Sequence, residues 1–207
     1  MPSYLALGDS YTCGEAVAPD QTFPLQLVAQ LTQKGVAIAD PTVIAVTGWT
    51  TGELAAGIAA QTLKPPYNLV TLLIGVNNQY RGEAKGYTLA AYKQEFAKLL
   101  QQAIHFAGDQ PKRVIVLSIP DWGAMPCADG QDRGAIAAQI DAYNDANRTK
   151  SQDRGVHYID ITAISRQAIN DPSLVASDNL HPSGAMYTQW VTALLPTAEA
   201  ILRGAEP

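Results

Sequence analysis

The chain has 207 residues, of which 47% are hydrophobic and 16% are charged, and its formal net charge is -5. This length and apolar content suit one sizeable core, so we expect a single domain over residues 1–207. The acidic balance and the lack of a basic stripe argue against a nucleic-acid partner, and no apolar run approaches the roughly 20 residues that a membrane span needs.

Short apolar runs bounded by turn residues predict β-strands. In chain order we expect five of them, at about residues 4–8, 42–47, 69–75, 113–119 and 156–160. The runs within 43–46, 69–74 and 114–117 are almost continuously apolar, which is typical of strands covered on both faces. These strands therefore predict a parallel sheet.

Helical patterns separate the strands. The first is expected at 24–34, where Pro24 suits the first turn and Gly35 the stop. Thr50 and Glu53 have the spacing of a capping box that opens the second helix. The remaining three helices are expected at about 89–107, at 134–154 and from residue 183 onward.

Alternating strands and helices predict a three-layer α/β/α sandwich, in which five strands suit the flavodoxin-like order 2-1-3-4-5. In such folds ligands bind beyond the carboxyl ends of the strands, where the strand order reverses. Ser10 follows the first strand within Gly8–Thr12 and is therefore a candidate nucleophile. The alternative is that Gly, Asp and Ser form an ordinary turn here.

Asp178 precedes His181 by three residues near the other end of the chain. A serine nucleophile needs a base that takes its proton and a carboxylate that orients the imidazole. The other two histidines have structural settings, because His105 falls late in an amphipathic stretch and His157 lies in an apolar run. The alternative for Asp178 is a turn or cap residue, but beside Ser10 and His181 it completes a triad.

Gly48 follows the second strand and Asn77 follows the third. Both are expected at the edge of the sheet that carries Ser10. The backbone amides of Ser10 and Gly48 and the Asn77 carboxamide would supply the preorganised donors that a tetrahedral oxyanion needs.

In their order and spacing, Ser10, Gly48, Asn77 and His181 resemble the four signature residues of the GDSL, or SGNH, hydrolase family. The resemblance spans residues 8–183 and implies a serine esterase or lipase-like hydrolase that cleaves a small-molecule ester or thioester without a metal or other cofactor. The chain departs from the family pattern at Asn78, because the family usually has Asp in that place.

Several side chains just beyond the strand ends are candidates for a substrate pocket. The candidates are Trp49, Tyr80, Arg81, Trp122 and Met125. The alternatives are that the aromatic side chains cap the core and that the arginine is simply solvated.

Two other functions remain open. An acyltransferase would use the same triad and pass the acyl group to an alcohol. A non-catalytic nucleotide or flavin binder would hold an anion at Thr47–Gly52, where a helix begins. That is the weaker interpretation, because phosphate loops in such folds usually follow the first strand.

Cellular location is also open. The N-terminus shows no basic segment followed by a long apolar core, so the sequence suits a cytoplasmic protein or a mature exported one. Cys13 and Cys127 are too few for a disulfide framework, and we expect free thiols.

Overall fold

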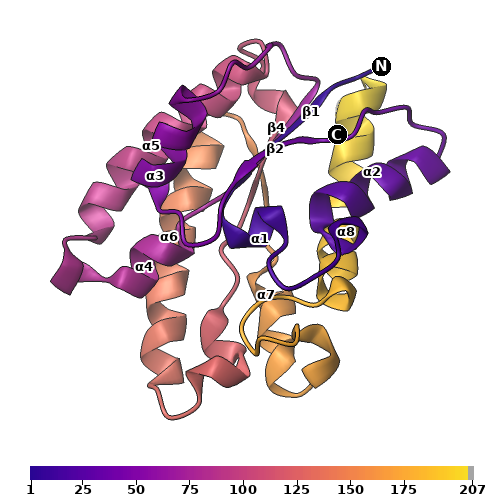
Figure 1. Cartoon of the computed structure of the whole chain (residues 1–207). Helices are drawn as coiled ribbons and strands as arrows, with labels where there is room; N and C mark the ends of the chain where they lie inside the picture. Colours follow the sequence, from indigo (N-terminus) through magenta and orange to yellow (C-terminus); the bar gives the residue numbers. More distant parts are fainter. Residues whose placement is uncertain (205–207) are drawn as a thin grey trace.

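A parallel sheet runs through the centre of the protein, which is described here by a computed structural model for residues 1–204 (Figure 1). Its strand order is β2-β1-β3-β4-β5, so the predicted order 2-1-3-4-5 is confirmed. The strands are β1 (Tyr4–Gly8), β2 (Thr42–Ala45), β3 (Leu69–Leu73), β4 (Val114–Leu117) and β5 (His157–Ile159). Three of them, β2, β3 and β4, end two residues earlier than the apolar runs suggest.

Strand β1 is an interior strand and pairs in parallel with β2 on one side and β3 on the other. All residues of β1 and β3 are buried, as expected of strands covered on both faces. Tyr4 and Thr71 share a buried hydrogen bond of 2.9 Å between their hydroxyl groups across this pair. This position places Ser10, just beyond β1, at the carboxyl edge between the ends of β2 and β3.

Helices cover the sheet in two layers (Figure 1). On one side α2 packs against α8, and on the other α5 packs against both α3 and α6. Shorter helices, α1, α4 and α7, lie toward the carboxyl edge, at the lower end of the sheet in Figure 1. The bounds are α1 (Ser10–Cys13), α2 (Phe23–Gln33), α3 (Thr51–Ala59), α4 (Val76–Arg81), α5 (Leu89–Phe106), α6 (Arg133–Asp153), α7 (Thr162–Ser165) and α8 (Gly184–Arg203).

Local sequence signals set the helix starts. Thr50 caps α3 and forms the predicted capping box with Glu53, in which each side chain bonds the other residue's backbone N–H. Thr88 and Ser183 accept hydrogen bonds from backbone amides at the starts of α5 and α8. The helices therefore begin within one or two residues of their predicted positions.

Strand β2 departs from the sequence expectation. The apolar run 43–46 predicts cover on both faces, and this prediction is wrong, because Val43 is 42% exposed and Val46 is 48% exposed, while Ile44 is buried. β2 is an edge strand with one neighbouring strand, and its two consecutive residues Thr42 and Val43 are both exposed, whereas Ile44 is buried. An apolar run therefore does not by itself distinguish an edge strand from a central one.

Within residues 1–204, none of the helices combines the length and the apolar character that crossing a bilayer requires.

Candidate active site

Ser10 is the first residue of α1, immediately beyond β1, and is only 4% exposed. Asp9 caps this helix by accepting a hydrogen bond of 3.1 Å from the Tyr11 backbone amide. A side chain at Gly8 would collide with Thr12 and with the Leu73 carbonyl, so the sharp turn from strand to helix requires glycine there. The turn fixes the serine just beyond the carboxyl end of β1.

Asp9 itself is fully buried beside the serine. Burial raises the pKa of its carboxyl to about 7, although the hydrogen bond from the Tyr11 amide acts in the opposite direction. The carboxyl group therefore differs from an exposed aspartate, which is ionised well below neutral pH.

His181 and Asp178 form a close pair. The distance from His181 Nδ1 to Asp178 Oδ2 is 2.6 Å, and Asp178 Oδ1 accepts the backbone amides of Leu180 and His181 at 3.0 and 2.9 Å. A carboxylate only accepts hydrogen bonds, so Nδ1 carries a proton, and in the neutral imidazole Nε2 is then the acceptor. Partial burial raises the pKa of Asp178, but the bonds from the His181 ring and from the two amides outweigh it, and the net pKa is lowered.

The loop that carries this pair lies against α1, although it is far away in the sequence. The Tyr11 ring meets the His181 ring edge to face, with the centroids 5.7 Å apart. Tyr187 donates a hydrogen bond of 3.0 Å from its hydroxyl to the Tyr11 carbonyl, and the Cys127 amide donates one of 3.0 Å to the Asn179 carbonyl. The histidine thus packs on the residue next to Ser10.

Gly48 and Asn77 belong to two segments that are also in contact. Asn77 Nδ2 donates a hydrogen bond of 2.9 Å to the Trp49 carbonyl, and an amide group has a second N–H that this bond does not use. Arg81 donates a hydrogen bond of 2.6 Å to the Gly48 carbonyl. Gly48 has φ of 86°, in the region that favours glycine, so a residue with a side chain would strain this turn.

The five candidate pocket residues have different surroundings. Tyr80 is 64% exposed and rests edge to face on the buried Trp122, with the ring centroids 5.1 Å apart. Trp49 is half-buried and covers Gly57, where any side chain would collide with the indole.

The side chains of Met125 and Arg81 make contacts inside the protein. Met125 is fully buried in the core. Arg81 bonds Glu53 at 3.2 Å and the Tyr87 hydroxyl at 3.1 Å in addition to the Gly48 carbonyl. Sequence reasoning missed this role of Arg81 because nothing local links it to Gly48.

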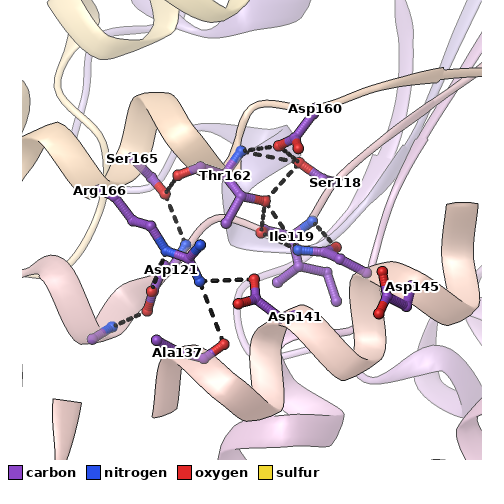
Figure 2. Close-up of polar contacts among 12 residues, drawn as sticks. Ser118, Ile119, Asp121, Ala137, Asp141, Asp145, Asp160, Thr162, Ser165 and Arg166 are labelled. Atoms are coloured by element: carbon purple, nitrogen blue, oxygen red, sulfur yellow. Dashed lines mark hydrogen bonds and ion pairs between the residues drawn. The ribbon is translucent and has the colours of Figure 1, made fainter. Parts of the chain in front are cut away.

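The loop after β4 is held by a second polar cluster (Figure 2). Arg166 lies between two carboxylates. Its Nε donates a hydrogen bond of 2.8 Å to Asp121 Oδ2, and its Nη2 donates one of 2.8 Å to Asp141 Oδ1. The Ser165 hydroxyl accepts the Asp121 amide at 2.8 Å. These bonds anchor the start of the loop that carries Trp122 and reaches the His181 loop, and no sequence motif marks them.

Cys13 and Cys127 are free thiols, as expected. Burial raises the pKa of both thiols, which favours the protonated form.

The five-stranded parallel sheet in the order 2-1-3-4-5, with helices around it, matches the α/β fold of the SGNH hydrolases. The chain belongs to the GDSL-like lipase/acylhydrolase family, whose sequence model matches residues 6–189. In the broad sense of this family it is a carboxylic ester hydrolase.

Several solved structures share the fold. An acetylxylan esterase from Geobacillus stearothermophilus is 18% identical with a TM-score of 0.73, over 95% of this chain and 94% of that chain. TesA is 18% identical with a TM-score of 0.73, over 96% and 99%. A lipase/acylhydrolase from Enterococcus faecalis is 21% identical with a TM-score of 0.71, over 98% and 97%. No curated protein matches the sequence.

Proposed function

We propose that the protein is a serine hydrolase that cleaves a small-molecule carboxylic ester or thioester through an acyl-enzyme intermediate. Ser10 is the nucleophile, His181 the general base and Asp178 the residue that orients the imidazole. The observation that carries this proposal is the 2.6 Å contact of His181 Nδ1 with Asp178, on a loop that packs on the neighbour of Ser10.

The reaction proceeds in two halves. His181 Nε2 takes the hydroxyl proton while Ser10 Oγ attacks the carbonyl carbon, and the same proton then goes to the leaving alcohol or thiol. In the second half His181 takes a proton from water, which attacks the acyl-enzyme, and Ser10 recovers its proton as the acid leaves. Asp178 stabilises the imidazolium that forms in each half.

The oxyanion would bind to the Ser10 and Gly48 amides and to the Asn77 carboxamide. Ser10 lies in the first turn of α1, where backbone amides have no acceptor within the helix. The contact of Asn77 with Trp49 supports this arrangement, because it holds the carboxamide against the residue that follows Gly48. Donors fixed in advance lower the barrier because they need no reorganisation as charge develops.

An anion-binding function at the start of α3 has less support. The Glu53 side chain occupies this helix end, with 2.8 Å from its Oε2 to the Thr50 amide. The Thr51 amide donates to Asn78 Oδ1 at 3.0 Å. A phosphate would have to displace both acceptors and would meet a carboxylate there.

A fluorophosphonate probe with identification of the labelled residue tests the proposal. We expect labelling at Ser10 and loss of p-nitrophenyl ester hydrolysis in Ser10→Ala, whereas Ser3→Ala at the opposite end of the sheet should retain both. His181→Ala should lose several orders of magnitude in kcat. The matched control is His105→Ala, because His105 also contacts an aspartate, Asp109 at 3.5 Å, but is exposed. Wild-type turnover in Ser10→Ala would refute the proposal.

Product analysis in the presence of an added alcohol separates hydrolase from transferase. The free acid should be the main product. A transferred ester as the main product would favour the acyltransferase instead.

A further inference from the structure

Asn78 occupies the place where the family pattern usually has Asp, and its side chain is bonded at both ends to one residue of α3. Asn78 is 2% exposed and Thr51 is 1% exposed, so this contact is shielded from water. The Thr51 amide donates to Asn78 Oδ1 at 3.0 Å, and Asn78 Nδ2 donates to Thr51 Oγ1 at 2.7 Å. The two residues are 27 positions apart in the sequence.

The directions of these bonds follow from the chemistry of the groups. A backbone N–H can only donate, so the Thr51 amide must face the oxygen of the Asn78 carboxamide. The carboxamide nitrogen therefore faces the Thr51 hydroxyl, whose oxygen accepts a hydrogen bond from it. The single hydroxyl proton is then left for Glu95 on α5, with which Thr51 Oγ1 is hydrogen bonded.

An aspartate in place of Asn78 would not fit this chain of bonds. Its carboxylate could still accept from the Thr51 amide, but it could not donate to the hydroxyl. Two carboxylates, the introduced one and Glu95, would then compete for one hydroxyl proton. One of them would lose its partner in a shielded site, where like charges also repel. Asn78 and Glu95 are thus matched to each other through Thr51.

This chain of bonds lies beside the proposed oxyanion donors. Asn77 is bonded to the Trp49 carbonyl, and the next residue, Asn78, is bonded to Thr51. Two consecutive side chains in the first turn of α4 therefore fix the segment 48–51, which begins with Gly48. A displacement of this segment would move the Gly48 amide relative to the Asn77 carboxamide.

We propose that Asn78 is a positioning residue for the oxyanion site and that Glu95 is its partner, with Thr51 as the bridge between them. This inference rests on the proposed hydrolase function. Asn78 acts through Gly48 and Asn77 and does not touch the substrate.

A double-mutant cycle of Asn78→Asp and Glu95→Gln tests the inference in the full chain, with p-nitrophenyl acetate as substrate. Asn78→Asp should lower kcat at least about tenfold with KM changed less than about threefold, because a misplaced donor weakens the transition state more than substrate binding. The kcat of Glu95→Gln alone should be close to that of the wild type, since the oxygen of the introduced amide still accepts the hydrogen bond from the Thr51 hydroxyl. The double variant should recover, because the introduced amide can donate to Thr51 Oγ1 while the hydroxyl donates to the introduced carboxylate.

Hydrogen exchange of the peptide that covers residues 47–54 gives a readout that does not depend on activity. Exchange should be faster in Asn78→Asp and return toward wild type in the double variant. Asn68→Asp is a matched control at the other end of the sheet, because Asn68 Oδ1 accepts from the Ser3 amide at 2.9 Å and a carboxylate can do the same. Its kcat and its exchange in this peptide should equal those of the wild type.

Wild-type kcat in Asn78→Asp, or a double variant no better than Asn78→Asp, would overturn the inference. If Asn78→Asp does not fold, recovery of folding in the double variant supports the pairing, and its failure to fold overturns it. Turnover that persists in Ser10→Ala would instead refute the proposed function, while the exchange measurements still test the bonds among Asn78, Thr51 and Glu95.

Discussion

Replacement of Asp9 by Asn should make the protein more stable at neutral pH and remove part of its pH dependence. The Asp9 carboxyl is fully buried, and within residues 1–204 its Oδ2 has no hydrogen-bond partner. Its Oδ1 accepts the Tyr11 amide at 3.1 Å, and an asparagine oxygen can accept the same bond because Asn caps helices as well as Asp does. The substitution therefore removes the charge and keeps the cap.

The pKa of Asp9 sets the sign and the size of the effect. Burial raises this pKa from 3.8 to about 7, so between these values the folded protein holds a proton that the unfolded chain has released. Stability therefore falls as the pH rises through this window. A difference of about three pKa units, at about 1.4 kcal/mol each, corresponds to at most about 4 kcal/mol at about pH 8.

Urea unfolding of wild type and Asp9→Asn across about pH 4 to 8 measures this difference. The free energy of unfolding of the variant minus that of the wild type should rise with pH by up to about 4 kcal/mol. Asp40→Asn, at an exposed carboxylate, provides the control substitution. A difference between Asp9→Asn and wild type that stays constant with pH would refute the reasoning.

Three further predictions concern the site and the core. Asn77→Ala should lower kcat by about 10² to 10³, the usual effect of deleting one oxyanion donor, and unchanged ester turnover would remove Asn77 from the site. Thr50→Ala should cost about 1 kcal/mol in chemical unfolding, because the capping box of α3 is lost, and an unchanged midpoint would contradict this. Leu27→Ala should cost about 2 to 5 kcal/mol, since Leu27 is fully buried on α2, and a smaller loss in calorimetry would mean that the core closes over the cavity.

The fold was predicted from local patterns in the sequence. Apolar runs and turn residues located the five strands, and the capping box at Thr50 and Glu53 located the start of α3, because these signals depend on neighbours within a few residues. Alternation of strand and helix then left few topologies, since crossovers between parallel strands are right-handed and connections are short. The pairing of Asp178 with His181 was also predicted from a spacing of three residues, and their side chains do bond.

Contacts between distant residues were decided by tertiary packing. Nothing in the sequence indicates that Tyr11 packs on His181, that Arg81 bonds the Gly48 carbonyl, or that Met125 is fully buried in the core. Whether the apolar residues of β2 are covered likewise depends on its place at the sheet edge. The physical reason is that hydrophobic periodicity and helix caps depend on residues close together in the sequence. The direction in which a side chain points and the residues that it contacts are fixed only when the helices and the sheet pack together.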